Sequence, residues 1–575
     1  MKHKSTTIAF SLLASALLLA NGTTQAALSS IATETSTISQ LTDYAATPEL
    51  PHDARDPNIS SDGSKVVFIS TADLTGQGTN PDNLETLFVM NADGTGLRQL
   101  TFVTINTTYP SDYNINYFIR KPQLSADGSV VVFSSTNNLL FSEDGSPLNP
   151  PGEITETYPD TPDLTYMTSF NQIFVMNADG TGLKQLTNGQ GNSISPAISH
   201  AGDIVVFQSN ADLIGENSDG NQEIYVIKTD GSRLSQITAG TGTKRHDSRD
   251  PDISGDGSTV AFDSYIDLIP PLNKDLSDEI FVFNLAGFWR DGATTADHSN
   301  YTVQITNSDI AHPDHSIEEN AFEATLSYDG TWVAFAACIN PDGEGVYKED
   351  RTILGTNPYL PDVLYIAKRD GTELKQLTFS DDPTAYTDED SIWTQNDDDI
   401  QRPQISDDGR RIVFASRSRV DIVNDDNHFE IAMIDLDAPE GPDGRPDVEQ
   451  LTFNTLHTGP YVLQLSFENT DGRKFDPKMS GNAGKILFRA DSDFTGGNPD
   501  HNKEIFMIEP NYIKSEEWTV NLNTATDDTP TNNDDSKSED LNSSADNSGG
   551  GAGFGIIEMV IALLSFGSLR LRRRQ

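Results

Sequence analysis

Short hydrophobic segments recur along the chain, with alternating apolar and polar positions and a glycine-containing turn between them. The segment VMNADGTGLRQLTF, residues 89–102, returns almost unchanged as VMNADGTGLKQLTN, residues 175–188. An apolar run, a turn with glycine and a second short run predict two antiparallel strands joined as a β-hairpin. Because a hairpin repeated at long intervals is typical of repeat architectures, the pattern predicts an all-β array.

The complete repeat has four predicted strands and occurs seven times. Its first two strands begin with DPNISSDGSKVVFIS, KPQLSADGSVVVFSS, SPAISHAGDIVVFQS, DPDISGDGSTVAFDS, EATLSYDGTWVAFAA, RPQISDDGRRIVFAS and DPKMSGNAGKILFRA. A segment similar to LFVMN predicts the third strand, and one similar to QLT predicts the fourth. The seventh copy lacks its fourth strand, whereas SQLT at residues 39–42 stands alone before the first copy. The sequence therefore predicts a seven-bladed β-propeller that an N-terminal strand closes.

Long insertions separate the predicted strands, because the repeats are spaced more widely than the roughly 40–50 residues of compact propeller repeats. Within a blade, the first-to-second and third-to-fourth turns lie on one face, and tight turns of the SSDGS and NADGTG types are expected there. The insertions are therefore expected on the other face; they are residues 136–170 and 337–361 and the crossings 102–120, 307–322, 379–401 and 453–475. Since the decorated face of a repeat protein is usually its binding face, we expect a ligand there.

The repeat, with xPxISxDGxxVxFxS, IFVMNxDG and QLT in order, resembles the TolB-type propeller repeat. The resemblance covers residues 39–510. It implies the propeller fold and a tendency to bind partners at the mouth of the central channel. TolB's N-terminal domain has no counterpart between the start of the chain and the first blade, so the role of TolB itself is not implied.

Both ends of the chain carry targeting signals. Lysines precede an apolar run at residues 8–20, and small residues follow at Ala26 and Ala27, which predicts a cleavable signal peptide over residues 1–26 and export through signal peptidase. The propeller is expected over residues 38–510. An acidic linker poor in apolar residues follows at 511–549 and is predicted to be disordered.

Residues 550–575 contain a short apolar segment and a terminal arginine cluster. The arginines favour the cytoplasmic side, which predicts a transient anchor in the inner membrane with the propeller outside the cytoplasm. Glycines, a short span and terminal arginines resemble the GlyGly-CTERM sorting tail. The resemblance implies cleavage near Gly549, Gly550 and Gly551 by a rhombosortase-like protease, and delivery to the bacterial cell surface or secretion.

The net charge of -49 argues against a nucleic-acid partner, because the chain has no basic surface that could replace counterions around phosphate. The acidic composition suits an exported protein or a calcium-binding protein. Cys338 is the single cysteine, so an intramolecular disulfide is excluded.

Loops between the second and third strands carry a repeated pattern of carboxylate and amide residues. It is clearest in blades three and seven, where the candidate metal ligands are Asp212, Asn217, Asp219, Asn221 and Glu223, and Asp493, Asn498, Asp500, Asn502 and Glu504. Because Ca²⁺ prefers six to eight hard oxygen ligands, the identical spacing predicts a calcium site in each loop. The alternative is that these side chains cap hairpin loops.

A second internal match pairs HDARDP in blade one with HDSRDP in blade four, each where an innermost strand begins at the channel mouth. The candidate binding residues are His52, Asp53, Arg55 and Asp56, and His246, Asp247, Arg249 and Asp250. Arginine forks at these positions could bind the carboxylate of a peptide terminus or a saccharide. The alternative, which we favour, is an Arg–Asp network that joins adjacent blades.

Motifs of common enzyme classes are missing from the sequence: it contains no GxSxG elbow, no HExxH and no Walker loop. The sequence therefore predicts an exported, surface-directed binding propeller for a protein, peptide or glycan. The alternative is a propeller lyase or hydrolase that acts on an acidic polysaccharide or peptide, and the His and Arg clusters are its support.

Overall fold

The computed structural model describes residues 30–32, 36–43, 53–76, 80, 83–102, 118–136, 139, 152–156, 164–168, 170–240, 247–270, 277–307, 320–338, 362–378, 400–416, 429–437, 448–450, 474–491, 495, 498 and 502–510. Contacts separate Met1–Trp518 from Thr519–Gln575, and every described residue lies in the first unit. The predicted signal peptide, linker and sorting tail lie outside the described residues. No described helix is long and apolar enough to span a lipid bilayer.

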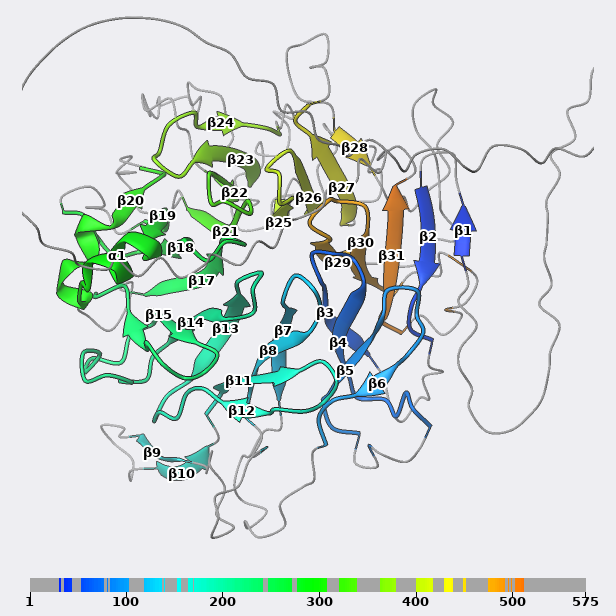
Figure 1. Ribbon diagram of the computed structural model, residues 1–575, viewed down its shortest axis with the longest axis horizontal. Helices are drawn as coiled ribbons and strands as arrows, with labels where there is room; N and C mark the ends of the chain where they lie inside the picture. The colour runs from blue at the N-terminus through cyan, green and yellow to red at the C-terminus, as the bar shows by residue number, and fades with distance from the viewer. Residues whose placement is uncertain are drawn as a thin grey trace, which may run out of the picture. The chain divides into compact units, whose positions relative to one another are not determined.

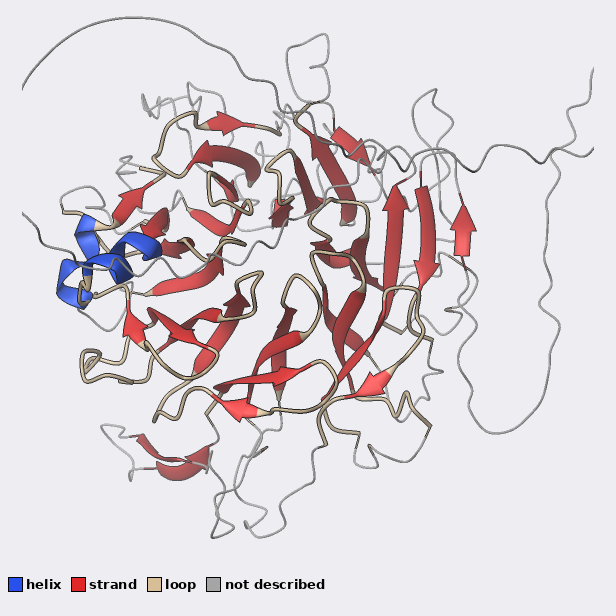
Figure 2. Ribbon diagram, viewed as in Figure 1, coloured by secondary structure: helices blue, strands red, loops and turns tan. Residues whose placement is uncertain are grey.

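The strands of the seven repeats form seven antiparallel sheets around a common centre (Figure 1, Figure 2). From the centre outward, blade one consists of β3 (Ala54–Ile59), β4 (Lys65–Ser70), β5 (Thr86–Asn91) and β6 (Arg98–Gln99). Blade two consists of β7 (Ile119–Leu124), β8 (Val130–Ser135), β11 (Gln172–Asn177) and β12 (Lys184–Gln185). Blade three consists of β13 (Ser193–Ile198), β14 (Ile204–Ser209), β15 (Glu223–Lys228) and β16 (Ser235–Gln236). Blade four consists of β17 (Ser248–Ile253), β18 (Thr259–Ser264), β19 (Glu279–Asn284) and β20 (Thr302–Gln304). Blade five consists of β21 (Ala321–Leu326), β22 (Trp332–Ala337), β23 (Val363–Lys368) and β24 (Lys375–Gln376). Blade six consists of β25 (Ile400–Ile405), β26 (Arg411–Ser416), β27 (Glu430–Asp435) and β28 (Val448–Gln450). Blade seven consists of β29 (Lys474–Met479), β30 (Ile486–Ala490), β31 (Glu504–Pro510), β2 (Ser36–Gln40) and β1 (Ser30–Ala32).

The innermost strands contact one another in chain order from β3 to β29, and β29 contacts β3, so the ring is closed. The predicted seven-bladed propeller is thus confirmed. Strand β2 pairs antiparallel with β31, with Gln40 opposite Phe506, as predicted for the N-terminal strand. It is not the outermost strand, however, because β1 pairs with its free edge and makes blade seven a five-stranded sheet.

The threonine of the QLT motif makes the same hydrogen bonds to the third strand in blades seven and three. In blade seven, the Thr42 hydroxyl accepts a hydrogen bond from the backbone N–H of Ile505 at 2.9 Å and donates one to the carboxylate of Glu504. In blade three, the Thr238 hydroxyl makes the same two bonds, to Ile224 and Glu223. The N-terminal QLT therefore does in blade seven what a continuous fourth strand does in the other blades.

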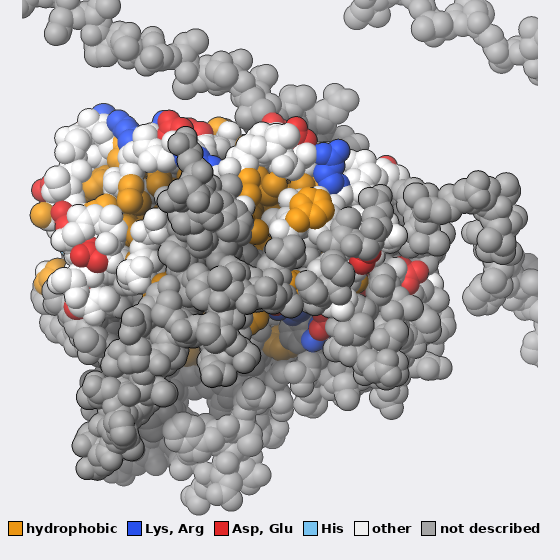
Figure 3. Space-filling view, turned by 90° about the horizontal axis from the view of Figure 1, so that it is seen from below, with side chains coloured by type: hydrophobic (Ala, Val, Ile, Leu, Met, Phe, Trp, Pro, Cys, Tyr) orange, Lys and Arg blue, Asp and Glu red, His pale blue; other side chains and the backbone are white. Residues whose placement is uncertain are grey.

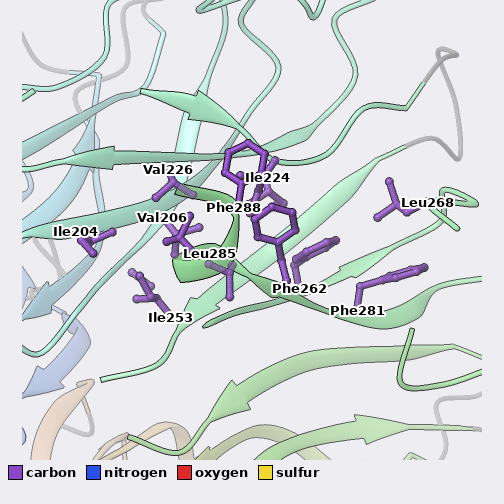
Figure 4. Close-up of a cluster of buried hydrophobic side chains, with 14 of the residues drawn as sticks. Ile204, Val206, Ile224, Val226, Ile253, Phe262, Leu268, Phe281, Leu285 and Phe288 are labelled. Carbon is purple, nitrogen blue, oxygen red and sulfur yellow. The ribbon is translucent and has the colours of Figure 1, made fainter. Parts of the chain in front are cut away.

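Apolar side chains of neighbouring blades pack into buried clusters between the sheets. Figure 4 shows the cluster between blades three and four, to which β15 contributes Ile224 and Val226, β18 contributes Phe262 and β19 contributes Phe281. Directly opposite aromatic rings stack between second and third strands, as Phe68 does on Phe88 with ring centroids 5.7 Å apart. Such a pair adds about 0.5–1.5 kcal/mol to the stabilisation from burial alone. The alternating pattern of the repeat is therefore the pattern of these inter-blade contacts.

The connection between the third and fourth strands of blade four differs from the tight turn expected there. It contains helix α1 (Leu285–Asp291) and the 3-10 helix η1 (Thr295–Asn300). Asn284 caps α1 by accepting from the Gly287 N–H at 2.9 Å, and Gly292 ends it in the left-handed conformation at φ 63°. Phe288 anchors the insertion, because it is buried in the cluster of Figure 4. The expectation that all long insertions lie on the opposite face is therefore wrong for blade four.

The face with the first-to-second turns is called the short-turn face below, and the opposite face the long-connection face. On the long-connection side of blade two, β9 (Gly152–Glu156) and β10 (Leu164–Thr168) pair as a separate two-stranded sheet within the predicted insertion.

On the side of the molecule drawn in Figure 3, acidic and basic side chains are interspersed with hydrophobic ones along the described surface.

Candidate functional site

Every innermost strand carries a β-bulge at the same place, and one residue within each bulge has a positive φ. These residues, which we call the bulge ring, are Asp56 (φ 48°), Lys121 (44°), Ser195 (52°), Asp250 (43°), Glu323 (56°), Arg402 (55°) and Asp476 (58°). A positive φ is uncommon outside glycine and costs of the order of 1–3 kcal/mol per residue. Such strained residues concentrate at ligand-binding sites, so one in every blade marks the ring as a candidate site.

The bulge ring lines a cavity of about 320 Å³ in the central channel. Bulges re-aim side chains, and here they turn the ring residues away from the blades into the channel. Two positions further along each inner strand lies a second set, the lower row; its members are Asn58, Gln123, Ala197, Asp252, Thr325, Gln404 and Lys478. Four of these, Gln123, Asp252, Gln404 and Lys478, also line the cavity.

Ion pairs within the bulge ring link different blades. Lys121 of blade two passes the small Ser195 of blade three, donating to its hydroxyl at 3.2 Å, and pairs with Asp250 of blade four at 2.9 Å. Arg402 pairs with Asp476 of the next blade. Three other cavity carboxylates accept from backbone N–H groups: Asp56 from Lys121, Glu323 from Arg402 and Asp252 from Leu326. The cavity is therefore strongly charged and only partly neutralised by its own lining.

Lys478 differs from the other cations that line the cavity. Arg120, Lys121 and Arg402 each form an ion pair, with Glu85, Asp250 and Asp476 respectively. Among the described residues, no carboxylate lies within the 4.0 Å ion-pair distance of the Lys478 ammonium. Burial lowers the pKa of Lys478 to about 8; Asp252 raises that pKa, while Arg402 and Lys121 lower it further. The ammonium thus lies within electrostatic reach of groups from several other blades.

At the short-turn face, a ring of backbone hydrogen bonds joins every blade to the next. It involves the residues that follow the inner strands, which we call the floor: Ser61, Ala126, His200, Gly255, Tyr328, Asp407 and Gly481. The ring begins with the Ala126 N–H donating to the His200 carbonyl at 3.1 Å and closes with the Gly481 N–H donating to the Ser61 carbonyl at 2.8 Å. These bonds fix the spacing of the blades at one end of the channel.

Floor side chains fill this end of the channel. His200 Nε2 lies 3.4 Å from a carboxylate oxygen of Asp407, and the Ser61 hydroxyl donates to the other oxygen at 2.6 Å. The His200 and Tyr328 rings lie 5.1 Å apart, and a Cβ at Gly255 would approach Tyr328 to 2.4 Å. Among the described residues these groups close the channel, so a ligand would reach the cavity from the long-connection face, where the inner strands begin.

The two arginines of the HDxRDP segments do not face the cavity; they form ion pairs beside it. Arg55 pairs with Glu85, which also pairs with Arg120 of blade two and accepts from the Ile119 N–H at 3.0 Å. Glu85 therefore joins blades one and two. Arg55 and Arg120 thus form ion pairs with the same carboxylate.

Arg249 makes the corresponding contacts in blade four, where it pairs with Asp278 and, at 3.3 Å, with Asp263. Both carboxylates are buried, which raises the pKa of Asp278 to about 7 although Arg249 lowers it. Burial and the neighbouring Asp278 also raise the pKa of Asp263. The Arg249 guanidinium is thus the cation for two buried carboxylates. Because two like charges repel each other, one of these carboxylates accepts a proton more readily than an isolated carboxylate does.

The remaining HDxRDP residues separate into three groups. Asp53 and Asp247 accept from backbone N–H groups of the preceding blade, Lys503 at 3.4 Å and Gln222 at 2.8 Å, and so join neighbouring blades. Asp56 and Asp250 belong to the bulge ring and line the cavity. The histidines at positions 52 and 246 lie outside the described residues.

In blade three, the five residues predicted to bind calcium bond largely to one another and to the loop backbone. Asp212 accepts from the N–H groups of Gly215 and Asn217 at 2.7 and 3.1 Å, and the Asn217 amide donates to the Asn221 carbonyl. Both carboxylate oxygens of Glu223 are occupied, by Thr238 and by the Gly240 N–H.

Asp219 is exposed, and the described residues contain no cluster of three or more His, Cys, Asp or Glu that could hold a metal ion. Hydrogen bonds within the loop are also what the hairpin-cap alternative would give, so they do not decide between the two interpretations. In blade seven, Asn498, Asn502 and Glu504 are buried, whereas Asp493 and Asp500 lie outside the described residues. Calcium stays a prediction, which melting curves with millimolar calcium and with excess chelator test.

Most of the bulge ring was missed from the sequence. Lys121, Ser195, Glu323, Arg402 and Asp476 vary in type, so no shared chemistry marked them. The available signal was position: six of the seven ring residues directly precede a proline, and the seventh, Glu323, precedes an alanine at the same place in the repeat. Lys478 was missed because its counterparts in other blades are mostly neutral.

No protein-family model and no curated protein matches the sequence. The chain is similar in fold to solved propeller structures of low sequence identity. An oligogalacturonate lyase in complex with manganese is 11% identical, with 84% of this chain and 96% of that chain covered and a TM-score of 0.43. TolB from Acinetobacter baumannii is 13% identical, with 80% of each chain covered and a TM-score of 0.32. The propeller domain of the trilobed protease from Pyrococcus furiosus is 9% identical, with 80% and 97% covered and a TM-score of 0.40.

Proposed function

We propose that this protein is a non-enzymatic binding propeller whose ligand, a peptide or a segment of a partner protein, enters the central channel from the long-connection face. The observation that carries the proposal is the cavity of about 320 Å³ lined by the bulge ring. Seven non-glycine residues held at positive φ around one cavity are costly to maintain, and binding is the use that such strain most often serves.

Two further features support the proposal: the first concerns the direction of entry and the second the kind of ligand. The floor closes the channel at the short-turn face among the described residues, through His200, Tyr328 and Asp407. The cavity lining combines charged side chains with the rigid rings of five prolines, so a ligand meets a polar site whose shape is largely formed in advance. A polar chain end or a charged segment suits such a site better than an apolar ligand does.

The proposal is tested with a panel of peptides and glycans applied to the purified full-length protein, with binding and product formation read on the same samples. We expect binding of one ligand class without new reducing ends, unsaturated products or new amines. Product formation would favour the alternative, a propeller lyase or hydrolase acting on an acidic polysaccharide or peptide. A glycan bound without turnover would keep the binding role and replace the ligand class.

We also propose export and release at the cell surface. The support is the order of signal peptide, propeller, acidic linker, apolar segment and arginine cluster in the sequence. Mass spectrometry of the surface or secreted form is expected to find an N-terminus near Ala27 and a C-terminus within the glycines at 549–551. Intact Arg574 on mature, released protein would refute processing of the tail.

A further inference from the structure

The lower row places two opposite charges across the channel. Of its members, Asn58, Gln123, Ala197, Thr325 and Gln404 are neutral, Asp252 of blade four is acidic and Lys478 of blade seven is basic. Blades four and seven are three steps apart in a ring of seven, which is the largest separation that the ring allows. The charged pair is therefore spread over the width of the cavity.

These two side chains influence each other without forming an ion pair. Asp252 is the largest electrostatic influence on the pKa of Lys478, yet no ion pair within 4.0 Å joins the two. Asp252 accepts from the Leu326 N–H at 2.9 Å, so its described hydrogen-bond donor is neutral. Glu323 of the adjacent blade also accepts from a backbone N–H, that of Arg402. Among the described residues, Lys478 has no ion-pair carboxylate and Asp252 and Glu323 have no ion-pair cation, and the gap between them lies within the cavity.

A ligand that fills this gap must satisfy both ends. A carboxylate is the group that a half-buried ammonium binds most strongly, and an ammonium is the matching group for Asp252 and Glu323. A ligand with a carboxylate alone would leave the acidic side unmatched, and one with an ammonium alone would leave Lys478 unmatched. The volume of about 320 Å³ accommodates a short molecule of this kind, since a water molecule takes about 30 Å³.

We propose that the cavity binds a zwitterion of the amino-acid type, a free amino acid or a short peptide, with its carboxylate on Lys478 and its α-ammonium on Asp252 and Glu323. This inference rests on the proposed function, because it names the chemistry by which a ligand is held in the same channel. Lys478, which the repeat pattern does not mark, binds the ligand carboxylate in this inference. Arg55 and Arg249 do not, because their guanidinium groups form ion pairs with acidic side chains.

The test uses the full-length protein and calorimetric titration with glycine, diglycine and triglycine, and with N-acetyl-diglycine and diglycine amide as single-charge analogues. We expect one of the three zwitterions to bind, with both analogues at least about tenfold weaker, because each analogue loses one charged hydrogen-bonding end. The length that binds best distinguishes a free amino acid from a short peptide.

The matched variants are Lys478→Met and Lys485→Met. Both lysines belong to blade seven, but Lys485 lies at the short-turn face, where it donates to the Gly63 carbonyl at 3.0 Å. Lys478→Met is expected to weaken binding of the zwitterion at least about tenfold. It is expected to leave the melting temperature unchanged or higher, because it removes a charge that has no ion-pair partner among the described residues. Lys478→Arg is expected to retain binding, and Lys485→Met to behave as wild type.

Equal affinity of wild type and Lys478→Met, equal affinity of diglycine and its analogues, or no binding of any zwitterion at 10 mM, roughly the weak limit of specific sites, would each overturn the inference. The proposed function is judged separately. If a panel ligand still binds and a substitution that blocks the cavity abolishes that binding, the channel remains the binding site and only the zwitterion assignment fails.

Discussion

At the residue scale, the structure shows how buried carboxylates are held by the repeat. Glu223 is fully buried, and its two oxygens accept from Thr238 and the Gly240 N–H. In blade two, Gln172 takes the same place and accepts from Thr187 at 2.8 Å and from the Gly189 N–H at 3.3 Å. A neutral amide therefore performs the same bonding without a charge.

This comparison predicts the effect of Glu223→Gln. Burial raises the pKa of Glu223 from 4.5 to about 7, so the stability that its protonated form contributes is present below pH 4.5 and is lost as pH rises through 7. The loss corresponds to roughly 3 kcal/mol. We expect the variant to melt above wild type at pH 8 and close to it at pH 4.5. A difference in melting temperature that does not change with pH across this range would show that folding does not raise the pKa of Glu223.

A second residue-scale prediction concerns Arg249, which pairs with the buried Asp263 and Asp278. Its removal leaves two buried carboxylates without their cation, so Arg249→Ala is expected to destabilise the fold by about 3–5 kcal/mol at pH 8, and by less at pH 5, where these carboxylates accept protons. Arg233→Ala, at an exposed turn over Trp289, serves as control and is expected to cost at most about 1 kcal/mol. An unchanged melting temperature with lost ligand binding would restore Arg249 as a binding residue.

The HDxRDP segments show why site prediction was harder than fold prediction. The repeat placed their arginines near the channel mouth, but Glu85, Asp263 and Asp278 decide their role. Glu85 and Asp278 both directly precede a third strand, whereas the counterpart of Asp263 in blade one is the apolar Ile69. The bulge ring was equally hidden, since a proline in the motif does not reveal that the residue before it takes a positive φ. Local pattern predicts which strand a residue is in, whereas its ion-pair partners come from other segments that the fold brings beside it.

At the element scale, the closing strand was readable from sequence because its signal was a missing copy. QLT is absent after the third strand of the last repeat and present at residues 40–42, and Gln40 pairs opposite Phe506 as expected. Strand β1 had no counterpart in other blades and was not predicted. The helices of blade four replaced an expected turn because NLAGFWRDG supplies a cap, a buried aromatic residue and a left-handed glycine in the same short segment.

Deleting residues 38–43 is therefore expected to lower the melting temperature markedly, because the deletion exposes the edge of β31 and removes the bonds of Thr42 to Glu504 and Ile505. Deleting residues 30–32, which form β1 outside β2, is the control and is expected to have a smaller effect. If both deletions lower the melting temperature equally, β2 is not the strand that closes the ring.

At the scale of the whole molecule, the propeller has two unlike ends. The floor ties all seven blades together by backbone hydrogen bonds and fills the channel with His200, Tyr328 and Asp407, whereas the bulge ring surrounds a charged cavity on the other side of it. Most long connections of the sequence begin and end on the long-connection face, apart from those of blade four and of blade six at residues 438–447. The architecture thus presents a cavity open toward one face.

The claim that the cavity is the ligand site is tested most directly by blocking it. Ser195 is the small member of the bulge ring, so Ser195→Trp is expected to fill the cavity, while Ser232→Trp places the same side chain at an exposed turn between β15 and β16. The affinity of a ligand identified by the panel is measured for wild type and both variants, with melting temperatures as a check on folding. We predict that Ser195→Trp loses binding while Ser232→Trp retains it; a folded Ser195→Trp variant that binds as tightly as wild type would contradict the account.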